Sequence, residues 1–140
     1  MLRNLKVEDF SDYLKLISQL TQVGEVTEKQ FVEFVNSQND NFSVLVYQLD
    51  DKIVGCVTYL IEQKIQRSYS CVMHIEDVVT DKDYRGRGIS KTLLDKSKEI
   101  AKEKNCYKII LDCSLDNIPF YEKIGFCKKE FQMVYRLKND

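Results

Sequence analysis

A short segment with two glycines constrains the fold of this chain more than any other feature. Gly86 and Gly88 follow Cys71–Val79, a stretch rich in apolar residues that predicts a β-strand. After the glycines, apolar residues from Leu93 to Ala101 recur at helical spacing, which predicts a long amphipathic helix. A strand that enters a helix through a glycine turn indicates an α/β domain rather than an all-helical or all-strand one.

The rest of the chain supplies further elements, each bounded by polar or turn-forming residues. Thr27 and Gln30 form a capping-box pattern, and Asp50-Asp51 separates two apolar runs as the turn of a hairpin. The predicted elements are a strand Leu2–Leu5, helices Val7–Leu20 and Thr27–Asn36, hairpin strands Phe42–Leu49 and Ile53–Ile65, a strand Lys108–Cys113 buried on both faces, a short helix from the capping residue Asn117 to Ile124, and a last strand Phe131–Leu137. This order predicts a mixed α/β fold with a parallel strand pair around the long helix.

Length and composition restrict the kinds of protein this chain can be. At 140 residues without a repeat or a linker, we expect one domain spanning 1–140. The 21 Lys and Arg residues nearly balance the 22 Asp and Glu residues, so no overall field favours nucleic acid or an anionic membrane. No run approaches the roughly 18 apolar residues of a membrane span, and Met1–Phe10 lacks the pattern of a signal peptide.

The cysteines and the single histidine give no metal-binding pattern. Five cysteines without a Cys-x-x-Cys pair do not form a zinc ligand set, and three of them sit in apolar, strand-like runs. We therefore expect no metal, reduced thiols and a cytoplasmic location.

The glycine segment is a candidate anion site. Unpaired N–H groups in the first turn of a helix, together with the positive end of its dipole, attract phosphate. Glycines allow a ligand close to the backbone, and Arg85 and Arg87 add positive charge locally. A pyrophosphate would suit this site, although the segment alone is equally consistent with a solvated loop.

The pattern Arg85-x-x-Gly88-x-Ser90 resembles the coenzyme-binding motif of the GNAT acetyltransferase superfamily. Within that superfamily the chain resembles the eukaryotic glucosamine-6-phosphate N-acetyltransferase family over almost its whole length. The most specific matches are His74-Ile75-Glu76-Asp77-Val78-Val79, Cys106-Tyr107-Lys108-Ile109-Ile110-Leu111-Asp112-Cys113, and Asn117 followed by Phe120-Tyr121-Glu122-Lys123-Ile124-Gly125-Phe126. One departure is Ser90, where the family usually has Gly or Ala; because serine keeps the backbone N–H, we expect coenzyme binding to survive.

The resemblance implies a fold, a reaction and an assembly. The fold would be the GNAT acyl-CoA N-acyltransferase fold, a central mixed β-sheet flanked by helices. The reaction would move the acetyl group of acetyl-CoA to the 2-amino group of glucosamine 6-phosphate by direct attack in a ternary complex. N-acetylglucosamine 6-phosphate and CoA would be the products, as a step of UDP-N-acetylglucosamine biosynthesis. The family also forms a dimer through its C-terminal region, so a homodimer is expected.

The resemblance also assigns residues to the coenzyme. Backbone groups of the glycine segment would hold the diphosphate, and Val78 and Val79 would offer backbone groups to the pantetheine arm and the acetyl carbonyl. The complete expected coenzyme set is Asp77, Val78, Val79, Arg85, Gly86, Arg87, Gly88, Ile89, Ser90, Asn117 and Tyr121. For the valines core packing is an alternative role, and for Asp77 a turn cap or a buried salt bridge is an equally good one.

Three residues are the candidates for chemistry. Tyr121 would be the general acid that protonates the departing thiolate, although most tyrosines simply pack their ring. Asp112 closes an apolar strand, where a charge needs a partner or a purpose, and the resemblance places it facing the amine. Glu76 would meet the substrate, partly through its backbone carbonyl, while Asp77 would point to the other face of a regular strand.

The resemblance further implies which residues contact the sugar phosphate. Its phosphate would be held by Thr21, Lys64, His74 and Arg136, some of them from a second subunit, and the complete expected substrate set is Thr21, Lys64, His74, Ile75, Glu76, Asp112 and Arg136. Taken alone, Lys64 or Arg136 would be interpreted as ordinary surface charge. Two alternatives remain open: a GNAT enzyme acting on a polyamine, an arylalkylamine or a protein N-terminus, and a non-catalytic acyl-CoA-binding module.

Overall fold

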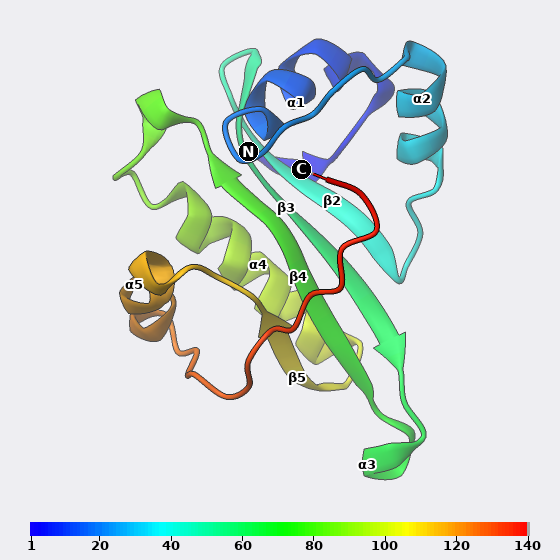
Figure 1. Ribbon diagram of the computed structural model, residues 1–140, viewed down its shortest axis with the longest axis vertical. Coiled ribbons are helices and arrows are strands. Elements are labelled where there is room, and N and C mark those ends of the chain that lie inside the picture. Colours follow the sequence, from blue (N-terminus) through cyan, green and yellow to red (C-terminus); the bar gives the residue numbers. More distant parts are fainter. Residues whose placement is uncertain (140) are drawn as a thin grey trace.

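The strands pair in chain order into one five-stranded sheet (Figure 1). The computed structural model describes residues 1–139, and its strands are β1 (Leu2–Asn4), β2 (Phe42–Leu49), β3 (Lys52–Gln63), β4 (Cys71–Thr80) and β5 (Cys106–Leu111). The first four pair antiparallel, whereas β4 and β5 are parallel. A parallel pair needs a long crossover, and helix α4 (Ile89–Glu103) supplies it. The predicted mixed α/β architecture is confirmed.

Helices cover the two faces of the sheet unequally. Helices α1 (Phe10–Ile17) and α2 (Glu28–Asn36) lie on one face of β2 and β3, and α4 lies on the opposite face. The remaining short elements are the single turns η1 (Val7–Asp9), η2 (Lys82–Tyr84) and η3 (Leu115–Asn117), the left-handed turn labelled α3 (Gln66–Tyr69) at the tip of β3 and β4, and α5 (Ile118–Lys123) after β5.

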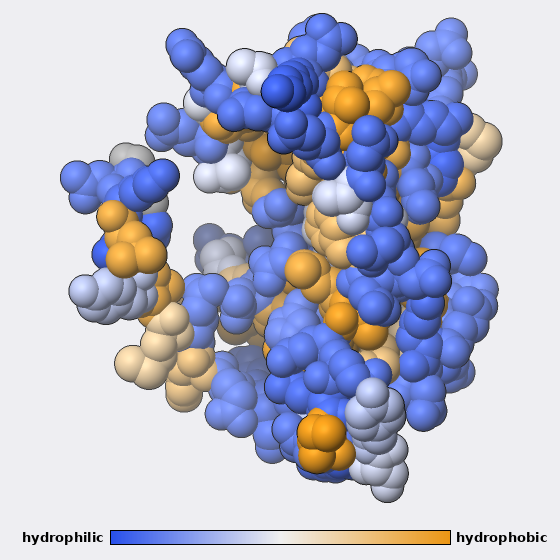
Figure 2. Space-filling model, turned by 90° about the vertical axis from the view of Figure 1, so that its right-hand side faces the viewer, coloured by the Kyte–Doolittle hydropathy of each residue, from blue (hydrophilic) through white to orange (hydrophobic). Residues whose placement is uncertain are grey.

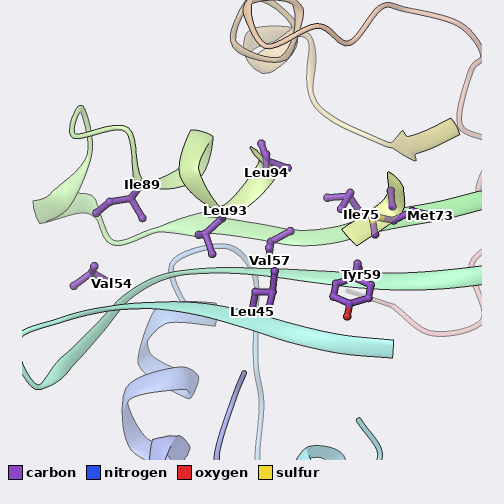
Figure 3. Packing of buried hydrophobic residues seen from close by; sticks show 10 residues of the cluster. Leu45, Val54, Val57, Tyr59, Met73, Ile75, Ile89, Leu93 and Leu94 are labelled. Carbon is purple, nitrogen blue, oxygen red and sulfur yellow. The ribbon is translucent and has the colours of Figure 1, made fainter. Parts of the chain in front are cut away.

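Two apolar clusters hold these layers together. Under α4, Leu93 and Leu94 pack on Val57 and Ile75 of the central strands, as Figure 3 shows. Under α1 and α2, Leu16 and Phe31 pack on valines of β2. On β2 the two clusters take alternate residues, whereas the irregularities of β3 and β4 shift this alternation; each helix presents one apolar stripe to one sheet face.

Of the predicted helices before the hairpin, the second has the predicted cap and the first is shorter than predicted. The Thr27 hydroxyl accepts a hydrogen bond from the Gln30 N–H at 3.1 Å, and the Gln30 side chain accepts one from the Thr27 N–H at 2.9 Å, which completes the capping box of α2. The helix predicted from Val7 begins as η1 and continues as α1 only to Ile17, three residues short of the predicted end.

Strand β5 differs from its prediction. The apolar run Ile109-Ile110-Leu111 predicted a strand buried on both faces, but β5 is the outer strand of the sheet among the described residues. Its inner face packs against the α4 cluster through Ile109 and Leu111, while Ile110 on the other face is 39% exposed. An apolar run marks a buried strand only when both faces are covered, and here α1 and α2 cover β2 and β3 instead.

The predicted last strand Phe131–Leu137 is wrong. From Phe126 to Asn139 the described chain contains no helix or strand. The side chains that alternate along this C-terminal segment are almost fully exposed: Phe131 95%, Met133 92%, Tyr135 88% and Leu137 88%. In Figure 2 the segment stands off the body of the molecule at the left, with apolar side chains facing solvent. The alternating pattern is present, but no strand within residues 1–139 lies beside it.

Candidate active site

A β-bulge interrupts β4 in the middle of its most distinctive sequence. Cys56 of β3 pairs with Val79, and Thr58 pairs with Glu76, so Asp77 and Val78 both lie opposite Val57. Asp77 has φ of 49°, a left-handed conformation that residues other than glycine rarely adopt. Bulges re-aim backbone and side-chain groups and are common beside active sites. This one turns the backbone of Asp77 and Val78 out of the regular ladder.

From Glu76 onward, β4 has no paired strand on its β5 side within residues 1–139. The parallel pairing with β5 ends at Ile75 and Leu111, whereas β4 continues to Thr80. The stretch Glu76–Thr80 therefore carries backbone groups that no strand of the described chain satisfies on the β5 side. We call the space beside this stretch the β4–β5 opening. An extended, hydrogen-bonding ligand could occupy it as a strand would.

The glycine segment lies at the end of this stretch of β4. Gly86 has φ of 79° and Gly88 has φ of 77°, and a Cβ atom at either position would meet no protein atom within 4 Å. Gly88 precedes α4, and no side chain caps the helix there. The first N–H groups of α4 and the positive end of its dipole therefore face open space, the arrangement that suits a phosphate.

Side-chain contacts fix the segment against the end of β4. Arg85 donates from Nε to the Thr80 carbonyl at 3.2 Å, and the Ser90 hydroxyl lies 2.6 Å from the Thr80 hydroxyl. The extra hydroxyl of Ser90 is thus engaged with the protein and leaves its backbone N–H available. Arg87 stacks on the Tyr84 ring with 4.8 Å between the guanidinium carbon and the ring centroid.

Gly55 is a position that the sequence patterns did not single out. A Cβ atom there would lie 2.7 Å from Cγ2 of Ile89, the first residue of α4, and 3.2 Å from Cδ1 of Leu93. The glycine lets the start of α4 approach β3 closely, and so it sets the distance between the glycine segment and the sheet. In the sequence it looks like an ordinary glycine within a strand. The residue that requires a glycine there, Ile89, follows 34 residues later.

Two of the candidate carboxylates, Glu76 and Asp112, interact at the end of the β4–β5 opening where the strand pairing stops. The pKa of Glu76 is raised by partial burial and by the charges of Asp112 and Asp77, while His74 opposes the rise. Asp112 follows the last residue of β5 and accepts a hydrogen bond from Gln132 Nε2 at 2.8 Å. A carboxylate with a raised pKa is a better proton acceptor, which suits a general base.

Asp77 does not follow the expected alternation. In a regular strand every second side chain faces α4, but Ile75 and Val78, three positions apart, both pack with the α4 cluster, and Val79 packs with the cluster under α1 and α2. Burial raises the pKa of Tyr13 and of Cys56 in that second cluster, and the charge of Asp77 adds to both rises. The bulge begins at this residue, so the period of two is lost there.

Tyr121 of α5 is half-buried at the edge of the α4 cluster. Its ring meets Phe120 and Phe126 edge-on, with centroids 5.1 and 5.8 Å away. Burial raises its pKa, and the nearby Cys113 adds to the rise, so the phenol keeps its proton at neutral pH. Asn117 stands at the N-cap position of α5, as predicted, but its side chain makes no capping hydrogen bond. Its amide is thus not committed to the helix start.

The residues expected around a sugar phosphate fall into separate places. Glu62 joins two of them, with His74 Nε2 at 2.9 Å and Lys64 Nζ at 3.1 Å from its carboxylate oxygens. Hydrogen bonds from His74 and Lys64 lower the pKa of Glu62. Thr21 lies exposed in the turn after α1, and Arg136 lies on the C-terminal segment. Ile75 is buried under α4, so only its backbone could meet a substrate.

Two features of the described residues bear on other classes of protein. Residues 1–139 contain no group of three or more His, Cys, Asp or Glu side chains arranged to hold a metal ion. None of the helices in that part of the chain has the length and apolar character needed to cross a membrane.

A glycine-lined helix start, a bulged strand and an unpaired strand end lie together in this site. Residues 4–126 match the model of the acetyltransferase (GNAT) family, and the chain belongs to that family. The match ends where the exposed C-terminal segment begins.

Within that family, relatives similar over nearly the whole chain are glucosamine 6-phosphate N-acetyltransferases, and the chain belongs with this group. It is 38% identical to the enzyme of Trypanosoma brucei brucei over 94% of this chain and 92% of that protein, and 36% identical to the Arabidopsis thaliana enzyme over 94% and 93%. The crystal structure of the Arabidopsis thaliana enzyme superposes with a TM-score of 0.93 at 34% identity, over 99% of this chain and 98% of the other. The predicted fold is confirmed.

Proposed function

We propose that this protein transfers the acetyl group of acetyl-CoA to the 2-amino group of glucosamine 6-phosphate. The observation that carries the proposal is the bulge at Asp77 and Val78 beside the β4–β5 opening, with the glycine segment at one end and the carboxylates of Glu76 and Asp112 at the other. The names of the relatives support the choice of acceptor.

The coenzyme would lie along the opening. GNAT proteins use acetyl-CoA as co-substrate, and here the backbone from Arg85 to Ser90 would hold its diphosphate. The pantetheine arm would replace the missing strand beside Asp77, Val78 and Val79, and Asn117 and Tyr121 would border it from α5. A backbone N–H turned out by the bulge would donate to the acetyl oxygen, where negative charge develops during acyl transfer.

The reaction needs a neutral amine and a stabilised thiolate. The amine nitrogen would attack the thioester carbon while Glu76 accepts its proton; the C–S bond then breaks, and the sulfur leaves as a thiolate. Tyr121 would donate its hydrogen bond to that sulfur. A thiol has a pKa of about 8.5 and a phenol about 10, so complete proton transfer from Tyr121 is uphill. The raised pKa of Tyr121 therefore favours a role that begins as hydrogen-bond donation.

Asp112 would orient the amine rather than act as the main base. Its charge raises the pKa of Glu76, which makes Glu76 the stronger proton acceptor of the two. Holding amine and thioester together can itself lower the barrier by several kcal/mol. The contact of Gln132 with Asp112 links this group to the C-terminal segment.

The sugar phosphate would bind at the nitrogen groups of Lys64 and His74 near Glu62. Lys64 and His74 share that carboxylate, and a phosphate could draw both of them toward itself. Thr21 and Arg136 are further candidates, and Arg136 could come from a second subunit.

An assay of free thiol release tests the acceptor. Glucosamine 6-phosphate should give a kcat/KM at least about 10²-fold above that of glucosamine, because the phosphate adds charged hydrogen bonds worth about 3 kcal/mol together. Spermidine and an N-terminal peptide test the alternative that the enzyme acetylates another amine. Equal rates for sugar phosphate and free sugar would contradict the assignment, and no turnover with tight acetyl-CoA binding would favour a non-catalytic binding module.

We also propose that the protein is a homodimer formed through the C-terminal segment. Four apolar side chains alternate along the segment and face solvent, and β5 has no further strand beside it in the described chain. A second copy could pair with that edge and bury these side chains. Light scattering should give a dimer for the wild type and a monomer for Met133→Lys, with Lys129→Glu as a matched control. A monomeric wild type at micromolar concentration would contradict this proposal.

We also propose that the protein is cytoplasmic and that its product serves UDP-N-acetylglucosamine synthesis. Five free cysteines, including Cys71 and Cys106 with sulfurs 3.1 Å apart, suit the reducing cytoplasm, and cell fractionation would test this. The product would serve UDP-N-acetylglucosamine synthesis, which depletion of the protein should reduce.

A further inference from the structure

Three buried polar side chains lie directly behind the bulge of β4, on its α1 side. Cys56 and Thr58 come from β3 and Tyr13 from α1, and all three are buried in a region that is otherwise apolar. Burying polar groups costs free energy unless they make hydrogen bonds, so a cluster of this kind at one place needs a reason.

The Cys56 thiol contacts the bulge through the Asp77 carbonyl. Its sulfur lies 3.5 Å from that carbonyl oxygen, to which the S–H donates. Burial and the Asp77 charge raise the pKa of the thiol to about 12, while the Val79 backbone N–H opposes the rise. The thiol therefore stays protonated and remains a donor at neutral pH.

The direction of the Asp77 carbonyl determines the direction of the next N–H. The Asp77–Val78 peptide is trans, and in a trans peptide the carbonyl and the following N–H point in opposite directions. Because the carbonyl points back to Cys56 on β3, the Val78 N–H points away from β3, toward the β4–β5 opening. A regular strand would not need a side chain to fix this peptide, but the left-handed Asp77 does.

Tyr13 and Thr58 enclose the thiol from the α1 side. The Tyr13 phenol is close enough to Cys56 and Asp77 for their charges to add to the rise that burial causes in its pKa. The nearby Thr58 hydroxyl opposes that rise in pKa. This hydroxyl is buried and makes no hydrogen bond with a described residue. The cluster thus surrounds the sulfur with buried groups and keeps it in place.

We propose that Cys56 is a positioning residue for acetyl transfer: its thiol holds the Asp77–Val78 peptide so that the Val78 N–H faces the acetyl oxygen of the coenzyme. The inference rests on the proposed function only in requiring acetyl-CoA in the β4–β5 opening; it does not depend on which amine is acetylated.

The test compares two variants of Cys56 that remove or replace its sulfur atom. Cys56→Ala removes the donor and acceptor, and kcat should fall by roughly tenfold, less than the 10²–10³ seen when an oxyanion donor is lost outright. The KM for acetyl-CoA should stay within about twofold, since most of the coenzyme binds elsewhere. Cys56→Ser keeps a donor and an acceptor and should restore most of kcat. Val44→Ala is the matched control, because Val44 is fully buried in the same cluster but lies on β2, which does not pair with β4.

A second measurement separates this inference from the proposed function. In a ¹⁵N NMR titration, the Val78 amide should shift more with acetyl-CoA than with CoA in the wild type, and this difference should disappear in Cys56→Ala. It needs no acceptor, so it stays decisive even if glucosamine 6-phosphate proves not to be the substrate. If Cys56→Ala does not fold, Cys56→Val lacks the hydrogen bonds while filling the core. Wild-type kcat and an unchanged Val78 shift in the variant, or an equal loss of kcat in Val44→Ala, would overturn the role of Cys56.

Discussion

Replacing Gly55 by alanine should weaken both the fold and coenzyme binding, although Gly55 touches no coenzyme in the proposed site. The new Cβ would lie 2.7 Å from Ile89 Cγ2, about 1 Å closer than two carbons normally pack. Ile89 cannot easily rotate away, because a β-branched side chain in a helix has one strongly preferred rotamer. The start of α4 must therefore move away from β3.

The size of the effect follows from that overlap. Overpacking a core by one methyl group costs about 1–3 kcal/mol, which for a domain of this length corresponds to a melting temperature roughly 4–12 °C lower. A displaced α4 would also lose about one good backbone hydrogen bond to the diphosphate, or about tenfold in the Kd of acetyl-CoA. Circular dichroism and calorimetry measure the two quantities. As a control, Gly24→Ala meets no atom within 4 Å, so it should cost only backbone strain and leave coenzyme binding unchanged.

A double-mutant cycle identifies the clash itself. Ile89→Ala removes the Cγ2 atom, so Gly55→Ala should cost little in that background, and the coupling between the two sites should reach about 1–3 kcal/mol. If Gly55→Ala has the same effect on stability with and without Ile89, or no effect at all, the close approach of α4 to β3 does not constrain this position.

Three further predictions concern the site and one helix end. Tyr121→Phe should lower kcat by roughly 10²–10⁴ with little change in acetyl-CoA affinity, measured by thiol release and calorimetry, and Tyr107→Phe should not. Asp112→Asn removes a charge that raises the pKa of Glu76, so the acid limb of the pH profile of kcat/KM should move to lower pH; an unmoved limb would exclude Glu76 as the base or its coupling to Asp112. Thr27→Ala should cost about 1 kcal/mol in urea unfolding, since it removes the cap of α2, and Thr27→Ser should cost much less.

The features that could be predicted from the sequence depend on neighbours along the chain. The capping box at Thr27, the hairpin turn and the glycine segment at Arg85–Ser90 each involve residues within a few positions of one another, so local patterns indicate them. The same holds for the parallel pair β4–β5, because strand, long helix and strand follow in order.

The features that could not be predicted depend on contacts between distant residues. Nothing near Asp77 marks a bulge: it is not a glycine, and its left-handed backbone is matched to Cys56, 21 residues away. The need for glycine at position 55 is explained only by the contact with Ile89. One face of β5 is exposed because α1 and α2 cover β2 and β3 and do not reach β5. In each case the missing information is which residue the fold brings opposite, and periodicity along one segment does not contain it.

The C-terminal segment combines both kinds of information. Its alternation of apolar and polar residues correctly indicates a sequence suited to a strand, and the structure correctly leaves it unpaired because no strand of the described chain lies beside it. A strand-like sequence with four apolar side chains in solvent is unstable as it stands, since each buried side chain of this size contributes about 1.5–3 kcal/mol. The two observations agree in the proposed homodimer, where a second copy of the chain would supply the missing neighbouring strand. Because Gln132 of this segment contacts Asp112 of the site within one chain, a variant that loses the dimer should lose activity as well as stability.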